Sequence, residues 1–179
     1  MRLSAGQAAP DFEVTDISTG MPLTLADFRG HKLLLSFHRY AACPFCNLHV
    51  HELSKSYAEF EKQGMKVLAL FRSGPERTLE QYGSREVPFQ IAADPKLSAY
   101  RAYGIEQSLL GMLVSFIHPR GLYATLKGFF PGKVDGEVRS LPADFLVTPD
   151  QKIARAYYST NITQHLALSE IGDFAREVG

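Results

Sequence analysis

The sequence predicts an α/β fold in which helices cover a central sheet. Strand-like and helix-like segments alternate along the chain, and such alternation is typical of a layered α/β domain. The clearest unit lies between residues 33 and 71. An apolar run over 33–37 predicts a strand buried on both faces, apolar residues three or four apart from Cys46 to Phe60 predict an amphipathic helix, and a second apolar run over 65–71 predicts the next strand.

Turn and cap residues bound the other predicted elements. Each begins at a polar or proline-containing turn or ends at a glycine, as local backbone geometry favours. In chain order they are a strand over 11–16 near the edge of the fold, helices over 73–83 and 94–104, a hairpin whose strands 145–147 and 152–154 flank the turn 148–151, and a final helix from Thr163 that covers the sheet.

The chain has the size and composition of one domain. It has 179 residues, 45% of them hydrophobic, and no linker-like run, so we expect a single domain over residues 1–179. The 19 basic and 19 acidic residues leave no net charge, which argues against a nucleic-acid partner. The first residues lack an apolar signal core and the longest apolar stretch, 109–117, is too short for a bilayer, so we expect a cytoplasmic protein without membrane association.

Two cysteines carry the clearest chemical signal in the sequence. Cys43 and Cys46 are the only cysteines, and they lie where the predicted helix begins. Side chains three positions apart on a helix are neighbours, about 5–6 Å between Cβ atoms, so a small distortion closes this pair into a disulfide. A Cys-x-x-Cys in a cytoplasmic βαβ protein is more often catalytic than structural, which predicts thiol–disulfide chemistry.

The position of each cysteine on the helix predicts its role. Cys43 precedes Pro44 at the helix start, where unpaired N–H groups and the positive end of the helix dipole favour a thiolate. Cys43 is therefore predicted to be the attacking sulfur. Cys46 lies one turn further along the apolar face, so we expect it to be less accessible and to resolve a mixed disulfide formed at Cys43.

Two other interpretations of the pair need consideration. Free cysteines are among the most buried residues, so these two could be ordinary core residues. They could also form half of a metal site completed by His49 and His51. At about 100° per residue, His51 points away from the cysteines and His49 only flanks them, so one helix cannot surround a zinc ion with all four side chains. We expect both histidines on the helix surface, and no metal or other cofactor.

Segments along nearly the whole chain match one family in order. They are Gly-Gln-Ala-Ala-Pro-Asp-Phe at 6–12, Leu-Thr-Leu-Ala-Asp-Phe-Arg-Gly at 23–30, Ala-Asp-Pro at 93–95, Ala-Tyr-Gly-Ile at 102–105 and Phe-Leu-Val-Thr-Pro-Asp at 145–150. These segments resemble the alkyl hydroperoxide reductase and thiol-specific antioxidant family, the peroxiredoxin-like branch of the thioredoxin fold. The resemblance implies a thioredoxin-like α/β fold with a central mixed sheet flanked by helices, an N-terminal strand extension, and a long insertion over 106–141 before the final hairpin.

The site region departs from that family at three positions. When Cys46 is aligned with the family's peroxidatic cysteine, Cys43 replaces a Thr or Ser and Arg39 replaces a Pro, while the family's later Arg falls on Pro142. Leu141-Pro142-Ala143 instead resembles the cis X-Pro of thioredoxin-fold proteins, which lies against the disulfide and shapes the substrate-facing wall. An ordinary trans proline entering an edge strand is the alternative. Arg39 either lowers a thiol pKa or binds peroxide, or is a solvated loop cation.

Proton transfer at this site needs a group that the local sequence does not show. Thioredoxins carry a buried acid on the strand leading into the Cys-x-x-Cys, whereas this chain has leucines over 33–35. His38 follows that strand, and a histidine in such a position more often packs than shuttles protons. We therefore expect proton transfer from Cys46 to use another base or water.

The residues and the resemblance together predict a thiol–disulfide oxidoreductase that uses the Cys43/Cys46 pair, with Pro142 and Arg39 at its site. The first alternative is a thiol-dependent peroxidase that reduces hydroperoxides, and the second is a redox-sensing or interaction module without turnover. The expected partners are a thiol or disulfide substrate, or a hydroperoxide, and an external reductant such as a thioredoxin-like protein or glutathione. The apolar segment within 106–141 predicts a lid or a homodimer contact, with a second small core under a loop as the alternative.

Overall fold

A mixed sheet of seven strands forms the centre of the computed structural model, which describes residues 2–105, 126–128 and 140–177. The strand order is β2-β1-β5-β4-β3-β6-β7. β3 pairs in parallel with β4, and β4 with β5, while the other pairings in the sheet are antiparallel. In chain order the strands are β1 Glu13–Asp16, β2 Pro22–Thr24, β3 Lys32–Phe37, β4 Met65–Phe71, β5 Gln90–Ala93, β6 Ala143–Val147 and β7 Ile153–Tyr158.

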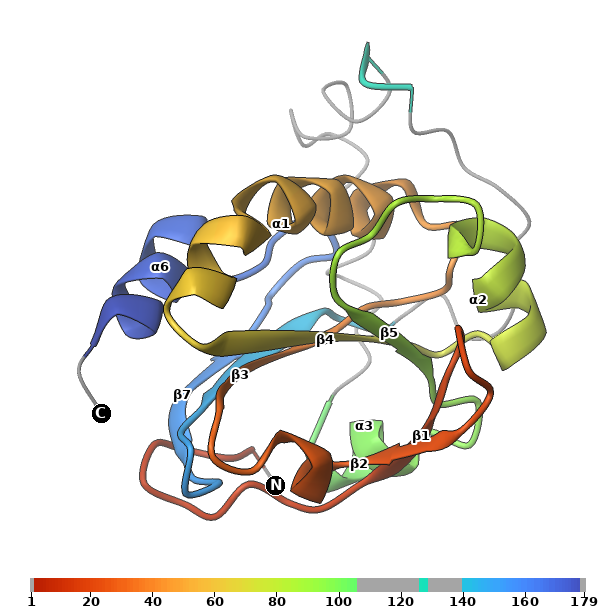
Figure 1. The fold of residues 1–179 in the computed structure, drawn as a ribbon. Coiled ribbons are helices and arrows are strands. Elements are labelled where there is room, and N and C mark those ends of the chain that lie inside the picture. Colours follow the sequence, from red (N-terminus) through yellow and green to blue (C-terminus); the bar gives the residue numbers. More distant parts are fainter. Residues whose placement is uncertain (1, 106–125, 129–139, 178–179) are drawn as a thin grey trace.

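Helices cover both faces of this sheet (Figure 1). α1 (Pro44–Lys62) and α6 (Leu168–Arg176) lie side by side over one face, and α2 (Pro75–Tyr82) contributes to the same half of the core. α3 (Ser98–Ala102) lies on the opposite face, near β1, and a 3-10 helix over Leu25–Phe28 follows β2. This arrangement confirms the predicted α/β layers.

Alternate residues of β3 enter the two halves of the core. Leu34 packs with the residues of α1 and α6, whereas Leu35 and Phe37 pack with Tyr100 of α3 on the other face. Successive side chains of a strand point to opposite faces of the sheet, and here helices cover both faces. The continuous apolar run over 33–37 follows from this double burial, and it fixes β3 as a central strand that leads directly into α1.

Some elements differ from what the sequence predicts. β2 has only three residues, and β5 is held by non-local pairs such as Asp16 with Ala92, so the local sequence predicts neither strand. The final helix begins at Leu168 and not at Thr163. Asn161 Oδ1 accepts hydrogen bonds from both the N–H and the hydroxyl of Thr163, and the N–H of Leu166 donates to Asp144, so this stretch stays outside the helix.

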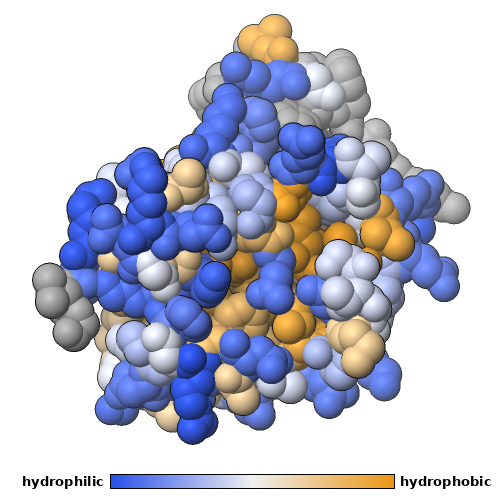
Figure 2. All heavy atoms as spheres, in the orientation of Figure 1, coloured by the Kyte–Doolittle hydropathy of each residue, from blue (hydrophilic) through white to orange (hydrophobic). Residues whose placement is uncertain are grey.

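The predicted insertion over 106–141 lies mostly outside the described residues, so its role as a lid or dimer contact stays a prediction. The face drawn in Figure 2 is largely hydrophilic, with hydrophobic residues visible in its middle, over β4 and β5. A pocket near this region is lined by residues that include Tyr57, Val67 and Phe89. None of the described helices is long and apolar enough to cross a membrane.

Candidate active site

The two cysteines lie at the start of α1, as predicted. Cys43 is the N-cap residue, and Pro44 is the first residue of the helix. Proline fits this position because the first N–H groups of a helix have no acceptor within it. The N–H of Asn47 donates to the carbonyl of Cys43 at 2.9 Å, which closes the first turn and brings Cys46 close to Cys43. Both thiols are free, so the structure describes the reduced dithiol form.

Both cysteines are completely buried, with 0% of each residue exposed. The prediction that Cys46 is the less accessible of the two is therefore wrong. The connector between β3 and α1 explains the difference, because its buried residues Tyr40 and Ala41 pack in the same cluster as the two thiols. This connector covers Cys43 as fully as the core covers Cys46, so a substrate reaches either sulfur only if the connector or its surroundings move.

The surroundings of Cys43 favour its thiolate. Burial by itself raises the pKa of this thiol, but hydrogen bonds and charge outweigh burial and lower the pKa from 9.0 to about 7. The Cys46 thiol donates to Cys43, Arg39 Nη1 lies 3.7 Å from its Sγ, and the N–H groups of Phe45 and Cys46 also donate to it. A helix N-terminus and a nearby guanidinium are the two features that most often lower a cysteine pKa.

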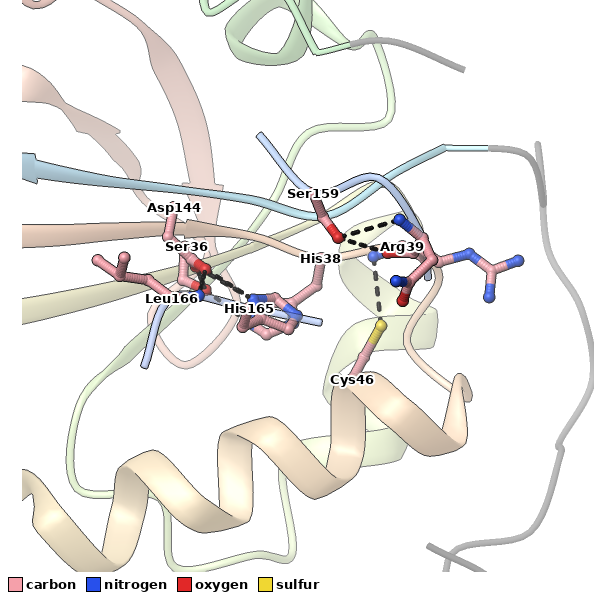
Figure 3. Close-up of polar contacts among 9 residues, drawn as sticks. Ser36, His38, Arg39, Cys46, Asp144, Ser159, His165 and Leu166 are labelled. Carbon is pink, nitrogen blue, oxygen red and sulfur yellow. Dashed lines mark hydrogen bonds and ion pairs between the residues drawn. The ribbon is translucent and has the colours of Figure 1, made fainter. Parts of the chain in front are cut away.

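The surroundings of Cys46 disfavour its thiolate. Burial raises its pKa well above the usual value, and the neighbouring Cys43 raises it further. The charge of Arg39 and a backbone hydrogen bond, from the Arg39 N–H to the Cys46 Sγ at 3.4 Å, offset this only in part (Figure 3). Near neutral pH, Cys43 can therefore ionise while Cys46 keeps its proton, which is the division of roles that the helix position predicts.

Arg39 is buried, at 4% exposed, so it is not a solvated loop cation. Its guanidinium lies 5.3 Å from the ring centre of Tyr40 and donates to the Cys43 Sγ. Its carbonyl accepts a hydrogen bond from the N–H of Arg72 at 3.1 Å, which ties the connector to the end of β4. A buried guanidinium beside a thiolate stabilises the charge strongly, because little water screens the interaction.

The side chain of Asn47 holds the connector by hydrogen bonds, a role that the sequence did not suggest. Its Nδ2 donates to the carbonyls of Ala41 at 3.0 Å and Cys43 at 2.7 Å. Its Oδ1 accepts from Gln81 at 3.1 Å and Arg85 at 2.6 Å. The signal that was available is an asparagine directly after Cys46 in the first turn of the helix, where a side-chain amide can reach the connector.

A second buried arginine, Arg72, also lies close to the connector and was not singled out from the sequence. Its side chain donates to the hydroxyl of Ser140 and lies 5.8 Å from the ring centre of Tyr100. The hydroxyl of Tyr100 in turn donates to the carbonyl of His38 at 2.6 Å. The connector that covers Cys43 is therefore held by side chains of α1 and α3 and by a backbone hydrogen bond from the residue after β4.

The expected cis bond before Pro142 is absent, because the Leu141–Pro142 peptide is trans and the described residues contain no cis peptide. The carbonyl of Pro142 accepts a hydrogen bond from the N–H of Ser159 at 3.1 Å, which continues the antiparallel pairing of β6 with β7. The trans peptide agrees with the alternative interpretation of this proline, but the strand it enters is not at the edge of the sheet, because β6 lies between β3 and β7. Pro142 itself is buried, and its place in a substrate-facing wall stays a prediction.

Two of the three histidines considered in the sequence are buried. His38 is 1% exposed and stacks on Phe71 with ring centres 4.8 Å apart, so it packs as expected. Burial, with the nearby His165, lowers the pKa of His38 well below its usual value. His51 is exposed, but the expectation that His49 lies on the surface is wrong, because His49 is only 2% exposed. The covering segment before α6 closes over His49, which helical periodicity alone does not reveal.

The structure does contain a buried acid near the site. It lies on the strand that pairs with β3, whereas thioredoxins carry their acid on the strand that leads into the Cys-x-x-Cys. Asp144 of β6 lies opposite Ser36 of β3 and is 0% exposed. Ser36 Oγ donates to Asp144 Oδ1 at 2.6 Å, as Figure 3 shows. The sequence contains no signal for this pairing, because 108 residues separate the two partners.

The fold and the paired thiols define a thioredoxin-like oxidoreductase. A model of the AhpC/TSA family matches residues 5–156 of the sequence. The chain belongs to this family. The resemblance drawn from the sequence segments is therefore confirmed, as is the mixed sheet flanked by helices that it implied.

Relatives carry both of the activities considered above. Peroxiredoxin Bcp of Escherichia coli (strain K12) is 29% identical over 119 residues, which cover 65% of this chain and 75% of Bcp. Thiol-disulfide oxidoreductase ResA of Halalkalibacterium halodurans is 30% identical over 102 residues, 56% of this chain and 57% of ResA. The crystal structure of peroxidoxin BcpB from Mycobacterium tuberculosis matches with a TM-score of 0.71 at 16% identity, covering 98% of this chain and 97% of that one, and so shares its fold.

Proposed function

We propose that the protein is a thiol-dependent peroxidase that reduces hydroperoxides through the Cys43/Cys46 pair. The observation that carries the proposal is the Cys43 thiol, whose pKa falls to about 7 beside the buried guanidinium of Arg39. A thiolate is the nucleophile toward peroxide, and a fixed cation stabilises the negative charge that develops on the leaving oxygen. Membership of the AhpC/TSA family and similarity to peroxiredoxin Bcp support peroxide over disulfide as the oxidising substrate.

The proposed reaction has two chemical steps before reduction. The Cys43 thiolate attacks one oxygen of the hydroperoxide, an S–O bond forms as the O–O bond breaks, and the leaving alkoxide takes a proton to become an alcohol. Cys43 is then a sulfenic acid. The Cys46 sulfur attacks the Cys43 sulfur, the S–O bond breaks, and the oxygen leaves as water with the proton from Cys46. An external dithiol returns two electrons to the Cys43–Cys46 disulfide and is itself oxidised.

Thiol–disulfide exchange, the main activity expected from the sequence, becomes the second candidate. The Cys-x-x-Cys at a helix start and the similarity to ResA favour it. The same Cys43 thiolate would then attack a substrate disulfide, and Cys46 would release the mixed disulfide. A module that senses redox state without turnover is the third candidate, and it differs from both enzymes because it would not consume reductant continuously.

Steady-state turnover separates these candidates. A thioredoxin-type reductant, kept reduced by NADPH, is supplied with the protein and either a hydroperoxide or a disulfide substrate such as insulin. The peroxidase predicts NADPH consumption that depends on hydroperoxide and on Cys43, with a kcat/KM well above that for the disulfide. A larger kcat/KM for the disulfide would favour the exchange enzyme instead, and no sustained consumption with either substrate would favour the sensor.

The proposal includes the setting in which the enzyme works. A reducing compartment such as the cytoplasm keeps the Cys43/Cys46 pair in its dithiol form, and a thioredoxin-like protein or glutathione is the external reductant. Homodimer formation through the segment 106–141 is part of the same proposal. Sedimentation at micromolar concentration tests it, and a monomer at that concentration would leave the segment as a lid or a local core.

A further inference from the structure

A cluster of buried polar side chains lies between β3, β6, α1 and the segment before α6, and the proposed peroxidase chemistry does not use it. Its members are Ser36, His49, Asp144 and His165, with His38 at its edge. Asp144 is 0% exposed, and the His165 side chain is 3% exposed. Figure 3 shows Asp144, Ser36 and His165 pointing toward one another, apart from the Arg39–Cys46 contact. Burying so many titratable groups costs free energy unless they are fully matched.

The hydrogen bonds fix which atoms of the cluster carry protons. Asp144 accepts from the Ser36 hydroxyl at 2.6 Å, from the Leu166 N–H at 2.7 Å, and from His165 Nδ1, which lies 3.1 Å from both carboxylate oxygens. An ionised carboxylate only accepts, so the His165 proton sits on Nδ1. This proton lies between the imidazole and the carboxylate. A divalent cation that displaces it would be bound by His165 Nδ1 and by one oxygen of Asp144, with the proton released to solvent.

His49 brings a second imidazole to the same place. Its ring stacks on that of His165, with centres 3.7 Å apart and planes 10° from parallel. One ligand atom from each of His49, Asp144 and His165 can be chosen so that all three lie within 4.8 Å of one another. Bonds of about 2.0–2.2 Å at tetrahedral angles place ligand atoms about 3.3–3.6 Å apart, so one cation would draw these atoms together by up to about 1.5 Å. Because the two rings are nearly parallel, the His49 ring would also rotate out of the stack to point its lone pair at the cation.

Charge and access both favour a cation at this position. The buried carboxylate of Asp144 needs a compensating positive charge, and within the described part of the chain its ion-pair contact is to His165, which is charged only when protonated. An open pocket of about 670 Å³ reaches the cluster and is lined by His49 and His165, with Glu52 among the other lining residues. This pocket gives a hydrated cation a path to the buried ligands.

We propose that His49, His165 and Asp144 form a binding site for a divalent transition-metal cation of the Zn²⁺ class, entered through this pocket. Two imidazole nitrogens and one carboxylate oxygen suit Zn²⁺ and its neighbours rather than Ca²⁺ or Mg²⁺, which prefer oxygen ligands alone. The set differs from the one considered in the sequence, because the exposed His51 is replaced by a histidine 116 positions after His49 and by an acid on β6. The proposal does not depend on the proposed peroxidase activity.

Zinc binding to an untagged, thiol-free chain tests this site. The full-length double variant Cys43→Ser/Cys46→Ser is used because thiolates bind Zn²⁺ themselves, and Zn²⁺ alone is titrated against a chromophoric chelator. We expect one Zn²⁺ per chain with a micromolar or tighter Kd. His49→Gln and His165→Gln should each weaken binding by at least about 10–100-fold, the range seen when groups supporting a metal site are removed. The matched control His51→Gln, on the same helix but exposed, should leave Kd unchanged.

A second measurement avoids variants that fail to fold. Long-range ¹⁵N–¹H spectra of the same thiol-free chain report the imidazole nitrogens directly, and Zn²⁺ should shift one nitrogen of His49 and one of His165 while those of His51 stay in place. A Kd weaker than about 100 μM, or binding that survives both histidine substitutions, would overturn the proposal. So would unshifted imidazole nitrogens at saturating Zn²⁺. The cluster would then be a hydrogen-bonded core in which His165 carries the compensating charge.

Discussion

The guanidinium of Arg39 donates from Nη1 to the Sγ of Cys43 across 3.7 Å, inside a site that is closed to solvent. This contact joins Arg39, the second residue after β3, to Cys43, the N-cap of α1, four positions later in the chain. Burial alone would raise the pKa of Cys43, yet its pKa is lowered to about 7. The hydrogen bond from the Cys46 thiol lowers this pKa most, and the charge of Arg39 lowers it further. The short loop between β3 and α1 therefore does more than connect two elements, because it adds a charge that favours the Cys43 thiolate near neutral pH.

The first prediction concerns the pH dependence of thiol labelling. In the reduced protein, the alkylation rate of Cys43 should rise through a midpoint near pH 7, while Cys46 should stay unlabelled until well above pH 9. Peptide mass spectrometry after brief iodoacetamide treatment at each pH measures both rates. Faster labelling of Cys46 would reverse the assigned roles and favour the family alignment in which Cys46 is peroxidatic.

The same pKa shift predicts a pH-dependent stability. The pKa of Cys43 is lower in the folded state than its ordinary value of 9.0, so its contribution to folding is fully present above pH 9 and is lost as pH falls through about 7. The free energy of unfolding of the reduced chain, measured against Cys43→Ser by urea denaturation, should therefore increase from pH 7 to pH 9. An equal pH dependence in the two proteins would show that no such shift exists.

The third prediction concerns Arg39. Replacing it with Gln should raise the pKa of Cys43 by about one unit or more, because an opposite charge at short range lowers a pKa by about 1–3 units. The rate with hydroperoxide should fall by about 10², as when one preorganised donor is removed. Arg39→Lys keeps the charge and should retain most of the pKa shift, whereas the exposed Arg29→Gln should change nothing. A labelling midpoint that stays near pH 7 in Arg39→Gln would exclude this role.

The fourth prediction separates the two cysteines chemically. With one equivalent of hydroperoxide, Cys46→Ser should form a stable sulfenic acid on Cys43, which dimedone traps, and should turn over no further. Cys43→Ser should leave Cys46 largely unoxidised, because burial and the neighbouring groups keep its pKa high. Mass spectrometry of the dimedone adduct locates the modified sulfur. An adduct on Cys46 in the Cys43→Ser chain, formed as fast as on Cys43, would contradict the assignment.

The fifth prediction concerns Asn47. Asn47→Ala leaves the buried carbonyls of Ala41 and Cys43 without its two hydrogen bonds, so the free energy of unfolding should fall by about 1–3 kcal/mol. Peroxide turnover should fall as well, since the connector loses its anchor. Gln81→Ala is the matched control, because it removes one donor to Asn47 and leaves the bond from Arg85. Equal losses in the two variants would show that the anchoring role is assigned to the wrong contacts.

Local patterns account for the part of the fold that the sequence predicts. The run over 33–37, the helical spacing after Cys46 and the turn over 148–151 are each contained within a few residues, and the structure confirms all three elements. The position of Cys43 and Cys46 at one helix terminus is also local, and the structure places both cysteines there as predicted. The predictions that the structure contradicts concern features that are set by non-local contacts. The trans peptide before Pro142 and the later start of α6 both depend on partners in other strands.

The candidate metal site also depends on non-local contacts that the local sequence does not indicate. Asp144 and Ser36 pair across two strands, and His165 reaches them only because the segment before α6 stays extended. A helix beginning at Thr163, as the sequence suggests, would carry His165 elsewhere. His49 was assigned to the surface for the same reason, because the segment that covers it comes from the other end of the chain.

The reaction of the reduced protein with hydroperoxide tests the central claim most directly. In stopped-flow mixing at pH 7.4, disulfide formation between Cys43 and Cys46 should be first order in hydroperoxide, with a second-order rate constant about 10² or more above that of free cysteine thiolate. The Cys43→Ser chain should show no fast phase. A wild-type rate constant equal to that of free cysteine thiolate, together with rapid oxidation by a disulfide substrate, would contradict the peroxidase and leave thiol–disulfide exchange as the function of this site.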